Sequence, residues 1–388
     1  MPPKPKYDYI IAGGGCAGLS LLMHMLAESS FRDCSILLIE KDAKQSNDRT
    51  WCYWEKGDGL FDSIVHAKWN KAWFHSNGYS ALKNLHPYQY KMIRGLDFYR
   101  HCHQCIERFP NVSIVRESVV DMGQTPGGAY VQTDVDRYEC SVVFNSIQLH
   151  PPVVSSDQYM LLQHFKGWII ETDAPAFNPN EPILMDFRVD QHAGTTFVYV
   201  MPLSDRRALV EYTLFTKELL NDQAYEAGLE RYVKEQLQLS QYTVVEREFG
   251  IIPMTNYRFS PGEGNIAQLG TMGGQTKPSS GYTFRFIQKH SAAIVQALKQ
   301  GKHPLIKRPA MDARFFWYDS VLLHLLHKEK MAGARIFSLL FKRNPIDRLF
   351  SFLDNESTLL QEAILLNTLP QWPFMKAGWE ELTKPTRN

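Results

Sequence analysis

The chain has 388 residues, and its composition, 44% hydrophobic and 21% charged, is that of an ordinary globular protein with room for a sizeable core. This composition excludes intrinsic disorder and collagen-like or coiled-coil fibres. Because 42 Lys and Arg residues balance 41 Asp and Glu residues, the chain has no overall basic field to attract nucleic acid, and we expect no nucleic-acid partner.

The six cysteines all lie in the first 140 residues and are too dilute for a disulfide scaffold, which favours a reducing compartment. Cys102 and Cys105 form a CxxC pair flanked by His101 and His103. No second pair follows at the spacing of a zinc site, and the stretch has a helical pattern. We therefore interpret these cysteines as buried or half-buried thiols, and we expect no metal.

The N-terminal residues predict a strand, a glycine turn, a helix and a second strand. Residues 7–12 (YDYIIA) are a short apolar run, and residues 13–18 (GGGCAG) have the pattern G-x-G-x-x-G. Residues 19–30 carry apolar side chains at helical spacing, and residues 35–40 (SILLIE) form a second apolar run that ends in an acid. This order is that of a dinucleotide-binding unit.

Each glycine of this pattern has a physical role. Gly13 allows a tight turn, Gly15 lets the backbone approach a pyrophosphate, and Gly18 lets the helix pack closely on the strand, while the helix N-terminus faces the phosphates. Glu40, 22 residues after Gly18, can bind ribose hydroxyls. The sequence therefore predicts a dinucleotide site, and a glycine turn without a ligand is the alternative.

The middle of the chain has the alternating patterns of strands. Residues 111–145 contain the stretches NVSIV, AYVQTDV and SVVF, which suggest hairpins. Residues 183–191, 195–203 and 207–215 look like neighbouring strands of a second sheet, and residues 217–239 have a helical pattern.

A second glycine-rich patch, residues 265–284, precedes a mainly helical region from Phe286 onward. A nucleotide signature at the N-terminus followed far along the chain by such a patch is more typical of FAD proteins than of simple NAD dehydrogenases. We expect three parts. They are a discontinuous dinucleotide-binding domain of residues 1–60, 90–150 and 260–300, an inserted sheet-based substrate domain of residues 61–89 and 151–259, and a helical region of residues 301–388 with a candidate membrane contact.

Five stretches, which together span nearly the whole chain, resemble the bacterial and plant lycopene β-cyclases, flavoproteins of the flavin-hydroxylase-like superfamily. The fourth, TKPSSGYTF with the glycines before it, is the most specific. The stretches are NDRTWCYW (47–54), YKMIRGLDFY (90–99), MDFRVDQ (185–191) followed by FVYVMPLS and RALVEYT, GTMGGQTKPSSGYTF (270–284), and FLDNESTLLQEAILLNTLPQWPF (352–374).

The resemblance implies an α/β fold, in which a Rossmann-like FAD-binding domain carries an inserted β-sheet substrate domain and a helical C-terminal part. It implies FAD in its reduced form, with NAD(P)H as the electron donor. The residues that it places at the cofactor are Gly13, Gly15, Gly18, Glu40, Arg49, Gly273, Gly274, Gly281 and Tyr282.

The reaction implied by the resemblance converts the linear ψ-ends of lycopene, or of a related acyclic carotenoid, to β-ionone rings, from lycopene through γ-carotene to β-carotene. It is an isomerisation of the intramolecular-lyase type without net redox change. A proton adds to the terminal double bond, the internal double bond attacks the resulting cation, and a second proton leaves. The chemistry needs an acid held in a dry pocket, a stabilised cation and the exclusion of water.

Glu211 is the candidate acid. An apolar pocket raises the pKa of a carboxyl group, which then stays protonated at neutral pH. In the run ALVEYTLF, strand alternation places Leu209, Glu211 and Thr213 on one face among apolar neighbours. A solvent-facing strand carboxylate is the alternative. The family motif usually has a second acid after this one, and here Tyr212 takes its place.

Asp190, beside Gln191, is a second candidate, for orientation of the substrate or as the base; Asp186 is a weaker one. Arg188 alternates with both aspartates, so a surface row of ion pairs is the competing interpretation. The flavin can stabilise the cation and is a rival proton source to Glu211. The aromatic side chains, 12% of the chain, can line the polyene pocket through cation–π contacts.

The substrate is insoluble in water, so the enzyme must reach a membrane. Residues 315–352 contain FFWY, LLHLL, IFSLLF and LFSFL, and between His327 and Arg348 the Lys and Arg residues outnumber the acids six to two. We expect a cytoplasmic protein that binds the inner face of the membrane peripherally through this segment. A buried helical pair with a solvated basic face is the alternative.

Two other functions share the dinucleotide signature. One is a flavin-dependent monooxygenase or reductase acting on an isoprenoid or carotenoid, which would consume NAD(P)H steadily. The other is a non-catalytic flavin- or carotenoid-binding protein. Pigment conversion in lycopene-accumulating cells discriminates the cyclase from both.

Overall fold

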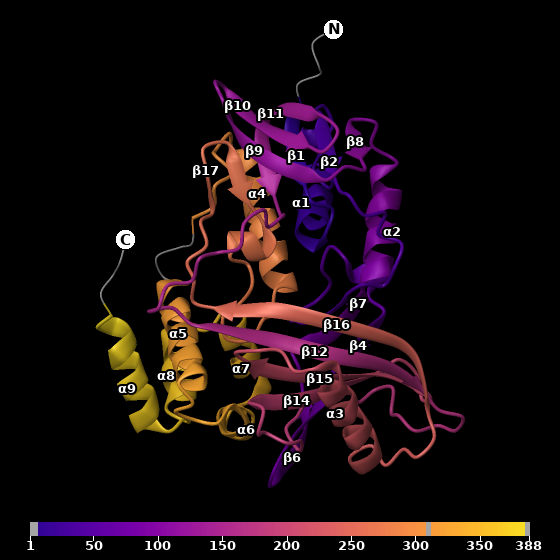
Figure 1. Cartoon of the computed structure of the whole chain (residues 1–388), viewed down its shortest axis with the longest axis vertical. Coiled ribbons are helices and arrows are strands. Elements are labelled where there is room, and N and C mark those ends of the chain that lie inside the picture. Colours follow the sequence, from indigo (N-terminus) through magenta and orange to yellow (C-terminus); the bar gives the residue numbers. More distant parts are fainter. Residues whose placement is uncertain (1–6, 308–311, 385–388) are drawn as a thin grey trace.

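The computed structural model describes residues 7–307 and 312–384. Two sheets lie one above the other along the long axis of the molecule, and the helices α5 to α9 lie along one side of the lower sheet (Figure 1). The upper sheet contains strands from distant parts of the chain, since β1 near the N-terminus and β18 at residues 266–268 both belong to it. Segments distant in sequence therefore meet at the boundary between the two sheets.

The upper sheet has eight strands and a parallel centre, in which β1 pairs with β2 on one side and β11 on the other. Its strands are β1 (Tyr7–Ala12), β2 (Ile36–Ile39), β8 (Val112–Val115), β9 (Val119–Thr125), β10 (Gly128–Thr133), β11 (Arg137–Asn145), β17 (Gly262–Glu263) and β18 (Ile266–Gln268). β2 is ILLI and is buried throughout, as expected for a parallel strand that is covered on both faces.

Helices cover one face of this sheet and a meander covers the other. α1 (Cys16–Leu26), α2 (Gly95–Ile106) and α4 (Phe284–Lys299) share one apolar cluster with Ile11 and Leu38 of the sheet. On the opposite side, apolar residues of β1 and β2 pack with residues of β10 and β11. The predicted strand, glycine turn, helix and strand of residues 7–40 are confirmed.

The lower sheet has seven strands in the order β16-β12-β15-β14-β13-β5-β6. They are β5 (Lys71–Ser76), β6 (Tyr79–Asn84), β12 (Met160–Glu171), β13 (Ile183–Asp186), β14 (Thr195–Pro202), β15 (Arg207–Thr216) and β16 (Thr243–Thr255). The predicted neighbouring strands of residues 183–215 are confirmed as β13, β14 and β15, which pair antiparallel in that order.

The two faces of the lower sheet have different coverings. α3 (Asp222–Glu235), shorter than the predicted helix of residues 217–239, packs on one face against Trp168, Val198 and Val210. The other face packs with α5 (Ala313–His327), α6 (Gly333–Arg343) and α7 (Ile346–Leu353), in one large apolar cluster. This second face also borders the cavity described below.

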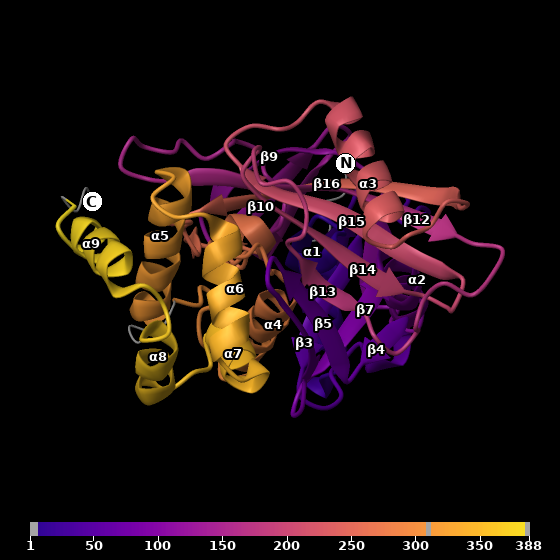
Figure 2. The same cartoon turned by 90° about the horizontal axis from the view of Figure 1, so that it is seen from below.

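A small sheet and two further helices complete the fold. β3 (Thr50–Glu55), β7 (Gln89–Arg94) and β4 (Ala67–Trp69) form a three-stranded antiparallel sheet. α8 (Leu359–Leu366) and α9 (Gln371–Leu382) follow α7 at the outer edge of the molecule (Figure 2). The structure shows which segments share a sheet. The division of the chain into the three expected parts stays a prediction.

Two expectations need correction. The stretch NVSIV, expected in a hairpin, is β8 and pairs parallel with β2. The apolar side chains of residues 315–352, expected at a membrane, are mostly buried: Phe315, Leu323 and Phe350 are at most 1% exposed. They fill the groove between α5, α6, α7 and the lower sheet, because that sheet face needs a cover as much as these helices do.

Candidate functional site

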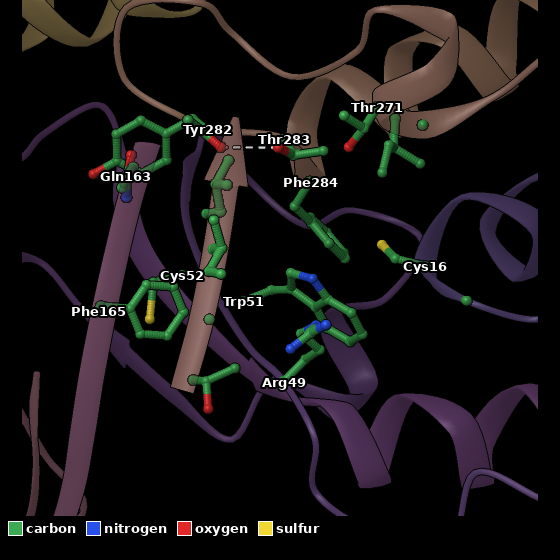
Figure 3. Close-up of a pocket in the computed structure, with 18 of the residues that line it drawn as sticks. Cys16, Arg49, Trp51, Cys52, Gln163, Phe165, Thr271, Tyr282, Thr283 and Phe284 are labelled. Atoms are coloured by element: carbon green, nitrogen blue, oxygen red, sulfur yellow. Dashed lines mark hydrogen bonds between the residues drawn. The ribbon is translucent and has the colours of Figure 1, made fainter. Parts of the chain in front are cut away.

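A cavity of about 560 Å3 lies between the two sheets. It extends from Cys16 and Thr271, at the start of α1 and in the second glycine patch, to Phe165, Cys52 and Tyr282 (Figure 3). Other lining residues are Gly15, Arg49, Trp51, Tyr90, Gln163, Tyr199, Glu211, Gly281 and Phe284. The cavity therefore joins the predicted dinucleotide turn to the predicted acid.

The glycine turn has the geometry that its sequence predicts. Gly13 has a φ of +100°, and a Cβ built on Gly18 would collide with the carbonyl oxygen of Gly13, so helix and strand approach as closely as glycine allows. A Cβ on Gly15 would meet no atom of the described residues within 4 Å. Gly15 is the N-cap of α1, and with Cys16 it opens onto the cavity. This N-terminus suits the pyrophosphate of a dinucleotide.

Glu40 holds the glycine turn, and Arg49 lines the cavity. One carboxylate oxygen of Glu40 accepts the N–H of Gly14 at 2.7 Å, and the other accepts the N–H of Asp42 at 2.8 Å. Glu40 thus fixes the turn from the end of β2, the position expected for the acid that faces a ribose. Arg49 is exposed at the cavity rim, next to Asp48.

The second glycine patch divides between two cavities. Gly281 and Tyr282 line the cavity with Glu211; Gly281 has a φ of +70°, and a Cβ there would collide with the side-chain amide of Gln163. Gly273 and Gly274 instead line a separate cavity of about 840 Å3. The structure therefore does not bring these two glycines together with the candidate acid.

Glu211 faces the cavity from the middle of β15, between β14 and β12. Burial, together with the charge of the neighbouring Glu248, raises the pKa of the Glu211 carboxyl well above its ordinary value. Thr213 donates a hydrogen bond to its Oε1 at 3.0 Å. These surroundings favour the protonated form of the carboxyl, as the candidate acid requires.

The tyrosines and the thiol that line the cavity around Glu211 are neutral. Burial raises the pKa of Tyr282 to about 12, and it raises the pKa values of Tyr199 and Tyr90 well above their ordinary value. The hydroxyls of Tyr199 and Tyr282 are 3.5 Å apart. Burial also raises the pKa of the Cys52 thiol, so no thiolate forms there at neutral pH. These lining residues therefore offer aromatic faces, and none of them is an ionised nucleophile.

The structure does not place Asp190 at this site. Its side chain is 49% exposed and lies near His192, and it accepts the N–H of that residue. Asp186 is fully buried, but Arg188 and Tyr232 bind its carboxylate. Of the ion pairs expected for Arg188, the one with the buried Asp186 is present. Neither aspartate lines the cavity, so the structure does not support the assignment of Asp190 to the site.

Several lining or neighbouring residues escaped the sequence analysis. Glu248 on β16 contacts Glu211, and Gln163 and Phe165 on β12 form the cavity wall. Gln163 Oε1 is buried and has no hydrogen-bond donor among the described residues. The alternation in VVEREFG could have indicated a strand at Glu248, but its partner strands are far away in sequence.

No group of three or more potential metal ligands gathers within residues 7–307 and 312–384. The residues present fit a dinucleotide: a glycine turn, a helix N-terminus that opens onto a cavity, and an acid at the end of β2. The donor set at the turn consists of backbone N–H groups, which bind phosphate oxygens.

Comparisons with known proteins agree with this geometry. The chain matches a family model described as lycopene cyclase protein over residues 8–378. A segment of 93 residues is 38% identical to a lycopene beta-cyclase of Paracoccus sp., and it spans 24% of this chain and 23% of that protein.

Solved structures show the same fold at low identity. A geranylgeranyl bacteriochlorophyll reductase-like protein from Thermoplasma acidophilum has a TM-score of 0.64 at 12% identity, over 98% of this chain and 97% of its own. A probable FAD-dependent monooxygenase from Pseudomonas aeruginosa has a TM-score of 0.59 at 13% identity, over 87% and 100%. The expected flavin-hydroxylase-like α/β fold is confirmed. Since the family model covers nearly the whole chain, the protein belongs to the lycopene cyclase family.

Proposed function

We propose that this protein is a lycopene β-cyclase, an isomerase that converts the linear ψ-ends of lycopene or a related acyclic carotenoid to β-ionone rings without net redox change. The observation that carries the proposal is Glu211: a carboxyl with a raised pKa faces a cavity lined by neutral aromatic side chains. Membership of the lycopene cyclase family supports the choice of substrate.

Glu211 starts the reaction as the general acid. Its proton moves to the terminal double bond, which leaves a tertiary cation on the carotenoid. The internal double bond attacks this cation and closes the ring, and a proton then leaves the ring carbon. Because the carboxyl is enclosed and not solvated, it keeps its proton until an alkene lies against it.

The lining protects the cation. The faces of Tyr199, Tyr282, Phe165 and Trp51, which all line the cavity, can each stabilise a cation by about 0.5–2 kcal/mol. The raised pKa values of the tyrosines and of Cys52 keep these groups un-ionised. A cation in this cavity therefore meets electron-rich faces, and no ionised nucleophile among them can trap it.

FAD is the proposed cofactor, in its reduced form and with NAD(P)H as the electron donor. Gly13, Gly15 and Gly18 would hold its pyrophosphate at the start of α1, Glu40 lies near the place of a ribose, and Gly281 and Tyr282 lie at the far end of the cavity. When bound, a reduced flavin supplies negative charge that favours a cation nearby.

A peripheral membrane contact is proposed at α8 and α9, in place of residues 315–352. Trp372, Trp379 and Leu360 are 76%, 69% and 72% exposed, and Leu359, Met375 and Leu382 are exposed beside them. These helices lie at the outer edge of the molecule in two views (Figures 1 and 2). Exposed Trp and Leu side chains on one helix face suit a bilayer interface. Within the described residues, the helices are too short or too polar for a membrane crossing.

The test is expression of the gene in cells that accumulate lycopene. Conversion of the red pigment to cyclic, orange-yellow carotenoids supports the proposal, and unchanged pigment contradicts it. Consumption of NAD(P)H in proportion to product would instead support a monooxygenase or reductase. Glu211→Gln should abolish ring formation while flavin still binds; retained activity would refute the role of Glu211.

A further inference from the structure

Four residues form a row across four adjacent strands of the lower sheet. Tyr199 on β14 lies opposite Glu211 on β15, Glu211 lies opposite Gly167 on β12, and Gly167 lies opposite Glu248 on β16. Directly opposed residues of antiparallel strands point to the same face of a sheet. All side chains of the row therefore stand on the face that borders the cavity.

The glycine in this row lets the two acids meet. A Cβ built on Gly167 would lie 2.8 Å from Glu248 Cγ and 3.0 Å from Glu248 Oε1, so the side chain of Glu248 lies directly over Gly167. Its carboxyl contacts that of Glu211, which reaches across from the other flanking strand. Strands two apart are about 10 Å from each other, a span that two glutamate side chains can bridge when the residue between has none.

The hydrogen bonds leave one place for a proton. Thr213 donates to Glu211 Oε1 at 3.0 Å, and Thr50 donates to Glu248 Oε2 at 2.9 Å. Glu248 Oε1 is buried and lacks a donor among the described residues. A buried acceptor without a donor destabilises the fold, and two carboxylates in contact repel. One proton carried by Glu211 and donated to Glu248 Oε1 removes both costs.

The surroundings decide which acid carries that proton. Burial raises the pKa of Glu248, but the hydrogen bonds from Thr50 and Glu211 and the charge of Arg49 oppose this rise. Burial and the charge of Glu248 raise the pKa of Glu211 well above its ordinary value, with only the hydrogen bond from Thr213 to oppose them. Glu248 is therefore the ionised member of the pair. The other titratable groups that face the pair are Cys52 of β3, Tyr199 of β14, Glu246 of β16 and Tyr282 of the glycine patch.

We propose that Glu248 is a positioning residue for Glu211: it accepts the hydrogen bond of the protonated carboxyl and so keeps the acid loaded at neutral pH. The inference rests on the proposed function, in which Glu211 protonates the alkene.

The contact between Glu248 and Glu211 also accounts for the end of the reaction. Once Glu211 has given up its proton, two carboxylates are in contact, and their repulsion drives the return of one proton from the ring carbon to Glu211. One proton leaves, one carbon–carbon bond forms and one proton comes back.

The test compares Glu248→Gln with wild type in the full-length, flavin-loaded protein. The substitution removes the negative charge and gives Glu211 a donor, so Glu211 ionises at lower pH. The alkaline limb of the pH–activity profile should move to lower pH by about one unit or more. The infrared carbonyl band of the protonated carboxyl, absent in Glu211→Gln, should titrate away at correspondingly lower pH. Glu171→Gln, an exposed acid on β12, is the matched control.

The outcomes separate the two proposals. If Glu248→Gln keeps the wild-type profile and the wild-type band, the role of Glu248 is refuted even where the protein cyclises lycopene. If the band shifts as expected but wild type forms no cyclic product, the carboxyl pair stands and the proposed function fails. Glu248→Asp keeps the negative charge but shortens the side chain. Its pH–activity profile should therefore lie closer to that of wild type than the profile of Glu248→Gln does. If Glu248 only filled space, the shorter Asp would be no closer to wild type than Gln. Flavin binding and the melting temperature report whether each variant folds.

Discussion

Alanine at position 167 would place a methyl group between the two carboxyls without changing either acid. Gly167 has ordinary strand backbone and no positive φ, so alanine can adopt its conformation. The new Cβ would lie 2.8 Å from Glu248 Cγ and 3.1 Å from Leu209 Cδ1. Because carbon atoms in contact are normally about 3.5–4.0 Å apart, Glu248 must retreat by about 1 Å.

That displacement is enough to break the bond between the acids. An O–H···O hydrogen bond to a charged oxygen is about 2.5–2.7 Å long, so a retreat of ~1 Å takes it past the range of a hydrogen bond. Such a bond contributes about 1.5–3 kcal/mol, and about 1.4 kcal/mol corresponds to one pH unit. The alkaline limb of the activity profile should therefore move down by about one to two pH units.

The assay is the rate of ring formation from lycopene in liposomes, with reduced FAD, measured across pH by chromatography of the carotenoids. Gly167→Ala should match wild type at acidic pH and lose activity progressively above neutrality. Flavin binding and thermal unfolding should stay close to wild type, because only the flexible side chain of Glu248 and the tip of the Leu209 side chain have to move. An unchanged pH profile in a folded, flavin-binding variant would refute the contact between the acids as a contribution, beside burial, to the raised pKa of Glu211.

Three further outcomes are expected. Since Glu211 has a raised pKa, the folded protein holds a proton that the unfolded chain releases above its ordinary pKa of 4.5, and stability falls as pH rises. Glu211→Gln should therefore raise the melting temperature more at pH 9 than at pH 5 by calorimetry; an equal gain at both would contradict this. Gly18→Ala should abolish flavin binding, seen as lost flavin absorbance after gel filtration, because its Cβ collides with the backbone of the turn; a flavin-loaded variant would contradict it. Replacing Trp372 and Trp379 by Glu should prevent flotation with liposomes, while Glu at the exposed Val153 should not, and flotation of both variants would exclude α8 and α9 as the contact.

Local patterns predicted a large part of this molecule. The turn at Gly13–Gly18 depends on residues that are neighbours in sequence, and so does the alternation that puts Glu211 and Thr213 on one strand face. These features need no knowledge of distant partners. The same holds for β13, β14 and β15, which follow one another through short connections.

Features that depend on long-range register were not predictable. Glu248 contacts Glu211 because β12 lies between β15 and β16 and pairs Gly167 with both acids. The register of such distant strands cannot be derived from a single sequence. The same limit explains the error at residues 315–352, since an apolar stripe on a helix does not say whether a sheet or a lipid surface covers it. Asp190 followed the strand pattern, but β13 ends at Asp186.

The position of Glu211 within its strand has a consequence for protein engineering. β15 is hydrogen-bonded to β14 on one side and β12 on the other along its length, so the backbone that carries the acid is fixed by the sheet. The opposite wall, by contrast, contains Gly281 and Tyr282 in a loop. Under the proposed function, libraries that aim to change the substrate or the product should therefore vary the loop and leave the strand untouched, since new substrate poses are easier to reach by reshaping the loop than by moving the proposed proton donor.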